Sequence, residues 1–134
     1  MRVLVATDGS DCSYQAAREF LRIAGTAGHE VTILHVMPML SVGRDAAYLQ
    51  IELEREGLGA LNAVGSIFRH AAVPAKTEML QGVPANAILE VAKDGNFELI
   101  VIGHKGKGGM REFLLGSVSR TIVKNAPCSV LVVR

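Results

Sequence analysis

The chain has 134 residues, of which 49% are hydrophobic and 20% charged, and its formal net charge is +1. This length and composition predict one globular domain over residues 1–134, which buries about two-thirds of its unfolded surface. The balanced charge gives no global field for nucleic acid, so we expect no nucleic-acid partner. Two cysteines without metal or disulfide spacing fit a cytoplasmic protein, and the short apolar stretch before Thr7 predicts neither export nor membrane insertion.

The first expected elements are a strand, a helix and a second strand. Residues 2–7 are apolar and β-branched and lead into Asp8-Gly9-Ser10, a turn whose Ser10 can cap a helix. Residues 12–27 have apolar side chains at helical spacing, and the apolar residues 31–37 form a strand that Pro38 ends. A connection that contains a helix is what two parallel strands require.

The middle of the chain is less informative. A loop at 39–46 is followed by a helix at 47–72, which we expect to be interrupted or bent around its glycines, Gly57, Gly59 and Gly65. Residues 76–80 alternate charged with other side chains, which favours a strand at the edge of the sheet. Pro84 then begins a helix that ends near Asp94.

The last third predicts a strand at 97–103, a long loop, a helix at 118–125 and a terminal strand at 128–133. The full order alternates strand and helix throughout. This alternation predicts an α/β fold with a five-stranded parallel sheet and helices on both faces.

The loop at 103–117 has the composition of an anion site. Its glycines let backbone N–H groups approach a ligand, and the helix that follows adds unpaired N–H groups and a partial positive charge. The loop matches neither the P-loop nor the GxGxxG pattern, yet it still favours phosphate. Its glycines are Gly103, Gly106, Gly108, Gly109 and Gly116, and its potentially basic side chains are His104, Lys105, Lys107 and Arg111, against the single acid Glu112.

The glycine spacing carries a family resemblance. Two residues separate Gly103 from Gly106, and nine separate Gly106 from Gly116-Ser117. This G-x2-G-x9-G-[S/T] pattern resembles the nucleotide loop of the ATP-binding branch of the universal stress protein family. The segments VLVATDGS and LLGSVSRTIVKNAPCSVLVV resemble the two ends of that family's domain. The resemblance implies a doubly wound, Rossmann-like fold of the adenine nucleotide alpha hydrolase type, strand order 3-2-1-4-5, and bound ATP with Mg²⁺.

That strand order places a switch point between the first and fourth strands, outside whose carboxyl ends ligands bind. Asp8 follows the first strand and Gly103 ends the fourth. An Asp-Gly-Ser turn alone explains Asp8, but the switch point and the resemblance together assign Asp8 to the nucleotide, through a ribose hydroxyl, the adenine edge or a magnesium-bound water. The resemblance implies a site made of Ala6, Thr7, Asp8, Val36, Ile102, Gly103, Lys105, Gly106, Gly116, Ser117, Val118 and Ser119.

Within this site the resemblance implies that the Val36 backbone contacts adenine and that residues 116–119 hold phosphates through N–H groups and hydroxyls. His104 departs from the family pattern, and three interpretations stay open: a phosphate donor, a residue that crowds the pocket, or a side chain in solvent. Lys107 and Arg111 are expected on the loop surface unless a triphosphate reaches them. The other histidines (His29, His35 and His70) are expected to be structural.

These features predict an ATP-binding stress-response regulator, either a nucleotide-dependent switch or a binding module. No catalytic residue and no general base is recognisable, so we expect at most slow hydrolysis. Cys12, near the start of the first helix, has no visible neighbouring base or resolving cysteine and is expected to have no role. One alternative is a nucleotidyl or phosphoryl transferase that uses the same loop and a second pocket in the middle segment. The other is a family member that has lost ATP and acts by protein contact.

The terminal strand, which begins at Cys128 and ends at Val133, is an edge in the order 3-2-1-4-5. It is continuously apolar from Val130 to Val133, with no interior charge, proline or glycine to discourage pairing. We therefore expect a homodimer in which two such edges pair antiparallel across a two-fold axis, as the resemblance also implies. The alternative is a monomer whose own loop shields the edge.

Overall fold

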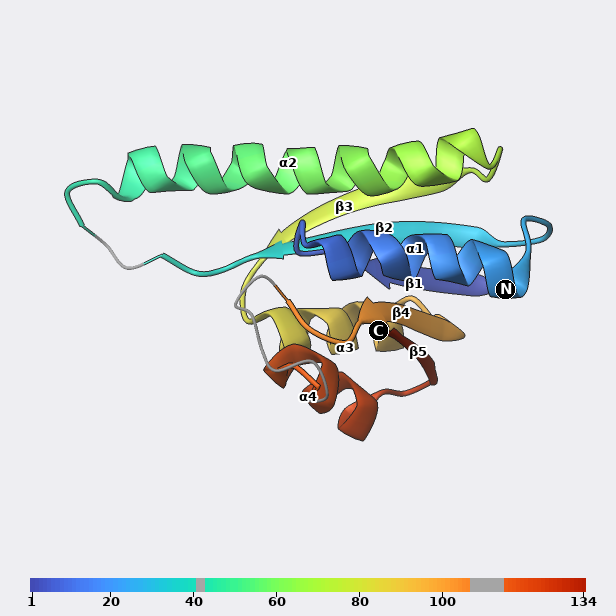
Figure 1. The fold of residues 1–134 in the computed structure, drawn as a ribbon. Helices are drawn as coiled ribbons and strands as arrows, with labels where there is room; N and C mark the ends of the chain where they lie inside the picture. The colour runs from blue at the N-terminus through green and yellow to red at the C-terminus, as the bar shows by residue number, and fades with distance from the viewer. Residues whose placement is uncertain (41–42, 107–114) are drawn as a thin grey trace.

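The fold is described by a computed structural model that covers residues 1–40, 43–106 and 115–134. Within these residues strands and helices alternate along the whole chain, as the sequence predicts (Figure 1). The elements are β1 (Arg2–Ala6), α1 (Asp11–Ala24), β2 (Glu30–Met37), α2 (Ala46–His70), β3 (Ala75–Gln81), α3 (Pro84–Asp94), β4 (Leu99–Gly103), α4 (Ser117–Asn125) and β5 (Ser129–Val133).

The described strands form one parallel sheet in the order β3-β2-β1-β4-β5, which confirms the predicted topology. The central strand β1 pairs with β2 on one side and with β4 on the other, so Val3 lies opposite both Val31 and Leu99. The chain winds from β1 towards β3 and then from β4 towards β5. The switch point therefore lies between β1 and β4.

Two apolar cores hold helices against the two faces of the sheet (Figure 1). On one face Phe20 of α1 and Phe68 of α2 pack over the odd-numbered valines of β1. On the other face Ile88 of α3 and Ile122 of α4 pack over Leu4. Burial on both faces explains why the central strands read as continuous apolar runs.

The helix α2 runs without interruption from Ala46 to His70, so the expected break around its glycines is wrong. Gly57 is buried where the helix crosses β2 and β3. A Cβ at this position would lie 2.7 Å from His35 Cδ2 and 2.8 Å from Met79 Cε. The glycine therefore allows the helix to approach the sheet closely, and the buried side chains of the following turns hold the helix together.

Several boundaries differ slightly from the predicted ones, for reasons visible in the backbone. The helix α1 ends at Ala24 because Gly25 adopts a φ of +74° and donates its N–H to the Leu21 carbonyl. The strand β4 begins at Leu99, since the Phe97 N–H still bonds to the Ala92 carbonyl of the preceding helix. Among the described residues no helix combines the length and the hydropathy needed to cross a bilayer.

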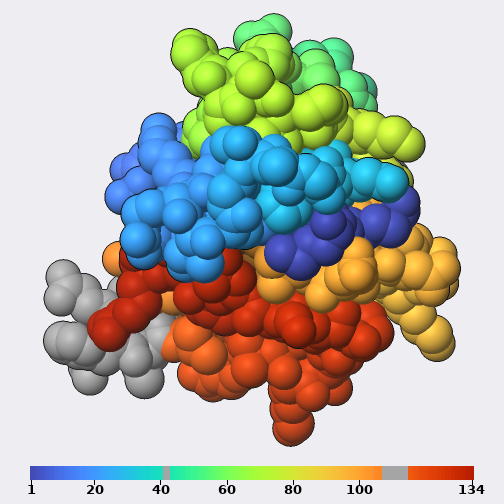
Figure 2. Space-filling model, turned by 90° about the vertical axis from the view of Figure 1, so that its right-hand side faces the viewer, coloured from blue at the N-terminus to red at the C-terminus, as the bar shows by residue number. Residues whose placement is uncertain are grey.

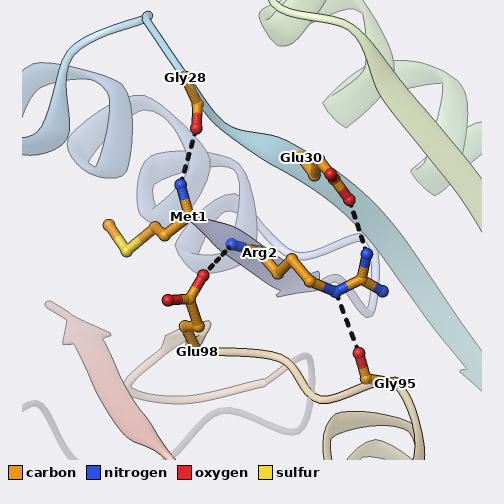
Figure 3. A network of polar contacts seen from close by, with 6 residues as sticks. All are labelled: Met1, Arg2, Gly28, Glu30, Gly95 and Glu98. Atoms are coloured by element: carbon orange, nitrogen blue, oxygen red, sulfur yellow. Dashed lines mark hydrogen bonds and ion pairs between the residues drawn. The ribbon is translucent and has the colours of Figure 1, made fainter.

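A polar network joins the amino-terminal ends of β1 and β2 to the segment before β4 (Figure 3). Because the strands are parallel, this end of the sheet is opposite to the carboxyl ends that flank the switch point. The N-terminal amine donates to the Gly28 carbonyl at 2.7 Å, and the Arg2 N–H donates to Glu98 Oε2 at 2.7 Å. The Arg2 guanidinium lies 2.6 Å from Glu30 Oε2 and donates to the Gly95 carbonyl at 3.0 Å. These exposed contacts fix the relative positions of the strands, although each contributes little alone because solvent screens it.

Candidate functional site

A cavity of about 410 Å³ opens at the carboxyl ends of β1 and β4, within the size range of small-molecule sites. All twelve residues proposed from the sequence line it, and they come from four separate segments of the chain. Four further residues complete its wall, namely Ser13, Leu34, Pro84 and Ile88. No local sequence signal points to these four, because only the packing of α1, β2 and α3 brings them to the crevice.

The turn after β1 is held by its own side chains. Thr7 Oγ1 accepts from the Gly9 N–H at 3.1 Å and lies 2.7 Å from Ser13 Oγ, while Asp8 Oδ1 accepts from the Ser10 N–H at 2.9 Å. Gly9 has a φ of +83°, a conformation that glycine adopts without a steric cost. These bonds hold the Asp8 side chain in one orientation in the wall of the cavity.

The loop after β4 lies against this turn. A Cβ on Gly106 would lie 2.6 Å from Asp8 Oδ2, and a Cβ on Gly103 would lie 2.9 Å from the Cys12 carbonyl carbon. Both distances are too short for any larger residue to fit without a shift. A larger residue at Gly103 or Gly106 would therefore force a shift where the two sides of the switch point meet.

The loop closes at the start of α4. The Gly116 N–H donates to the His104 carbonyl at 2.7 Å, and the Gly116 carbonyl accepts the first helical bond, from Arg120, at 2.9 Å. Helical geometry leaves the N–H groups of residues 117–119 without intrahelical partners. These groups border the cavity and give it a set of anion-binding donors.

The Ser119 hydroxyl has a partner within the protein. The side chain is buried, and its hydroxyl donates to the Gly103 carbonyl at 2.7 Å. A hydroxyl has one proton, so Ser119 can offer a ligand its backbone N–H and a lone pair but not a second O–H donor. Ser117, in contrast, has an exposed side chain at the cavity.

The opposite wall of the cavity is apolar. It combines side chains of β2, α3 and β4, among them Val36, Ile88 and Ile102. The cavity thus has a hydrophobic side suited to a flat aromatic ring and a side rich in N–H groups suited to an anion.

His104 occupies none of the three positions considered for it. Its side chain is buried, does not line the cavity, and has Nδ1 3.2 Å from the Val133 carbonyl, to which the His104 N–H also donates at 2.8 Å. The ring therefore joins the loop to the end of β5. His104 Nδ1 also lies 3.7 Å from Cys12 Sγ, a neighbour that the sequence did not predict. Because this nitrogen donates to the Val133 carbonyl, it carries the ring proton and does not act as a base toward the Cys12 thiol.

The interior of the loop, with Lys107, Gly108, Gly109, Arg111 and Glu112, lies outside the described residues. In residues 1–40, 43–106 and 115–134, no group of three or more His, Cys, Asp or Glu side chains is placed to hold a metal ion. Any Mg²⁺ at this cavity would take most of its oxygen ligands from the phosphates of a ligand and from water, as Mg²⁺ commonly does.

The sheet order and the crevice at its switch point define a doubly wound, Rossmann-like α/β protein. The chain belongs to the universal stress protein family, whose model matches residues 1–134. It is 39% identical to universal stress protein MJ0531 of Methanocaldococcus jannaschii, over 99% of this chain and 81% of the relative. It is 33% identical to universal stress protein YxiE of Bacillus subtilis, over 99% of this chain and 98% of the relative.

Solved structures of the family share the fold. Universal stress protein UspA from Lactobacillus plantarum matches with a TM-score of 0.86 at 28% identity, over 100% of this chain and 97% of that one. A universal stress protein in complex with cAMP matches with a TM-score of 0.77 at 26% identity, over 100% and 97% of the two chains. The Archaeoglobus fulgidus protein in complex with dAMP has the same fold, with a TM-score of 0.74 at 24% identity over 100% and 98%.

Proposed function

We propose that this protein is an ATP-binding regulator of the stress response and that the cavity at the switch point is its nucleotide site. The observation that carries the proposal is the convergence on one cavity of the Asp8 turn, the Gly103–Gly106 segment and the N-terminus of α4. The N–H groups of α4 would bind phosphates, and the apolar wall would enclose the base. The cAMP complex of a structural neighbour supports an adenine nucleotide as the ligand class.

Each of the twelve cavity residues proposed from the sequence has a proposed task. Lys105, Gly106 and residues 116–119 would bind phosphate, and Asp8 would bind the ribose or a Mg²⁺-bound water. The Val36 backbone would pair with the adenine edge, while Ala6, Thr7, Ile102 and Gly103 form the floor. The narrow fit of Gly106 against Asp8 supports this arrangement, because the backbone of the loop can then approach a ligand beside the carboxylate.

We propose that the protein acts as a switch or binding module and hydrolyses ATP slowly at most. Among the described residues that line the cavity, the one carboxylate is Asp8, and this group already accepts the Ser10 N–H. His104, which has a basic ring, points away from the cavity to Val133. Fast turnover needs a base within hydrogen-bond reach of the attacking water. The proposal gives Asp8 to the ribose or to a Mg²⁺-bound water and leaves His104 outside the cavity, so it assigns this role to neither group.

We also propose a cytoplasmic homodimer that pairs through β5. The strand is an edge of the sheet, and its middle residues are half-buried. The C-terminal segment reaches the surface beside α1 (Figure 2), where a groove runs between Ile23 and Leu131. Cys12 and Cys128 are free thiols, which fits a reducing compartment, and burial raises the pKa of the Cys128 thiol and so disfavours the reactive thiolate.

The direct test of the proposed ligand is to purify the protein under native conditions, release bound small molecules with acid and identify them by chromatography and mass spectrometry. We expect ATP or another adenine nucleotide in amounts approaching the protein concentration. A Gly106→Val variant purified in parallel should release none. Equal amounts from both proteins, or none from the wild type after supplementation with ATP and Mg²⁺, would refute the site.

A further inference from the structure

The buried side chain of His35 makes a hydrogen bond to the backbone of the turn after β1. It is buried in β2, and its ring Nδ1 lies 2.8 Å from the Thr7 carbonyl oxygen, just beyond the end of β1. A carbonyl oxygen can only accept, so Nδ1 carries the ring proton and donates it to Thr7. The ring itself does not line the cavity.

This bond occurs where the pairing of β1 with β2 stops. In a parallel ladder alternate residues bond to opposite neighbours. The Leu34 carbonyl accepts from the Thr7 N–H at 2.9 Å, on the β1 side, and the Met37 carbonyl accepts from the Gly82 N–H at 2.8 Å, on the β3 side. The backbone N–H and C=O of Val36 therefore face the β1 side, where regular pairing would give them the Thr7 carbonyl and the Gly9 N–H.

Both of those partners are bonded elsewhere. A carbonyl oxygen can accept two hydrogen bonds, but within the described residues the Thr7 carbonyl accepts from His35 Nδ1 and no bond joins it to the Val36 N–H. The Gly9 N–H donates to Thr7 Oγ1 at 3.1 Å. Two side chains thus replace two rungs of the ladder. Val36 lines the cavity, and its backbone offers one donor and one acceptor side by side.

The position of the His35 ring is fixed from behind. Gly57 of α2 lies directly over it, and a Cβ there would be 2.7 Å from His35 Cδ2. The ring is thus held between α2 and the sheet, with Nδ1 towards Thr7. Packing of this kind keeps a donor oriented without further hydrogen bonds.

We propose that His35 is a positioning residue that ends the β1–β2 ladder by taking the Thr7 carbonyl, and so leaves the Val36 backbone free to pair with the base of the nucleotide. This inference rests on the proposed nucleotide site. The Val36 N–H matches the acceptor N1 of adenine, and the Val36 carbonyl matches its 6-amino group. A hypoxanthine base presents the opposite pattern at these two atoms, so the same edge discriminates ATP from ITP.

Two substitutions separate the donor from the ring. In His35→Asn the side-chain amide nitrogen can take the place of the ring Nδ1 and keep the bond to Thr7, whereas His35→Leu fills similar space without a donor. His70→Leu serves as a control, because His70 is an exposed histidine whose ring contacts the Ser66 carbonyl of its own helix. In His35→Leu the Thr7 carbonyl is released to accept the Val36 N–H.

Amide hydrogen exchange without nucleotide measures this release. We expect the exchange of Val36 relative to that of Leu34 to slow by about tenfold in His35→Leu, and to stay at the wild-type ratio in His35→Asn and His70→Leu. The ratio removes any general loss of stability. An unchanged ratio in His35→Leu would overturn the inference.

Two further readouts complete the test. The ratio of the dissociation constants for ITP and ATP should fall about tenfold in His35→Leu and stay at the wild-type value in His35→Asn. An unchanged ratio in His35→Leu contradicts the inference. Ring ¹⁵N shifts of the wild-type protein need no variant and should show the proton on Nδ1 of His35, so a proton on Nε2 alone also overturns it. Failure of the wild type to bind ATP refutes the proposed function instead, because the exchange and ¹⁵N measurements are made without ligand.

Discussion

Asp8 and Gly106 approach each other so closely that a Cβ added to Gly106 would lie 2.6 Å from Asp8 Oδ2. The two residues are far apart in the sequence and belong to the two sides of the switch point. Their contact joins the turn after β1 to the loop after β4. Any side chain at position 106 must therefore displace either the carboxylate or the loop.

The first prediction follows from this contact. Gly106→Val should weaken ATP binding by at least about tenfold, because the valine displaces Asp8 and fills space next to the phosphate site. Binding is measured by titration calorimetry, and circular dichroism confirms that the variant is folded. Gly59→Ala is the matched control, since a Cβ there meets nothing within 4 Å. Equal ATP affinity in Gly106→Val and Gly59→Ala would contradict the proposed site.

The two glycines of α2 predict opposite effects on stability. Gly59→Ala should raise the free energy of unfolding by about 0.5–1 kcal/mol, through helix propensity alone. Gly57→Ala makes the same gain but brings its Cβ against the His35 ring and Met79, and overpacking of this kind costs about 1–3 kcal/mol. We expect Gly57→Ala to be less stable than the wild type in urea denaturation. A Gly57→Ala variant as stable as Gly59→Ala would mean that the helix moves away from β2 at no cost.

The proposed dimer can be tested at a single strand position. The Val133 carbonyl accepts the His104 N–H of the β4 side, so alternation turns the Val132 N–H outward from the sheet edge and the Leu131 N–H inward. Val132→Pro should remove one bond across the dimer and leave the fold intact, whereas Leu131→Pro should break the β4 ladder and destabilise the monomer. Sedimentation equilibrium decides the outcome. We expect the wild type at twice the chain mass of 14.3 kDa and Val132→Pro nearer to 14.3 kDa, while a wild-type monomer at micromolar concentration would rule out β5 as the assembly surface.

Slow hydrolysis is the fourth prediction. Since the proposal assigns none of the described cavity residues to activate water, steady-state turnover of ATP should fall below about 1 s⁻¹, the lower end of the usual enzyme range. Phosphate release with saturating ATP and Mg²⁺ gives the rate. A value within the range of about 1–1000 s⁻¹ would favour the transferase or hydrolase alternative.

Much of the fold could be predicted from the sequence, because the helices and strands follow strong local patterns. The apolar runs of β1, β2 and β4 and the Pro84 start of α3 lie where expected. The break predicted in α2 was wrong because a glycine can weaken a helix or allow it to pack closely, and the sequence does not tell the two effects apart. Gly57 lowers helix propensity locally, but its role here is the close contact with His35, which depends on a strand far away in the sequence.

The candidate site could be predicted only in part, because some of its residues are placed by contacts between segments that are far apart in the sequence. The glycines and Asp8 have a recognisable spacing, and the structure brings them to one cavity. Ser13 and Ile88 carry no signal of their own, since their place in the wall depends on helix packing. The position of His104, 3.7 Å from Cys12 Sγ, could not be predicted because this contact arises only when α1 docks on the end of β4. The free backbone of Val36 could not be predicted either, because the register of β1 against β2 decides which residues turn their N–H and C=O groups towards β1.

Calorimetric titration of nucleotide-free protein with ATP and Mg²⁺ shows most directly whether the switch-point cavity binds ATP. We expect saturable binding near one ATP per chain, with a dissociation constant below about 0.1 mM, which corresponds to roughly −5.5 kcal/mol. The absence of saturable binding of ATP to folded, nucleotide-free wild-type protein would contradict the proposed function.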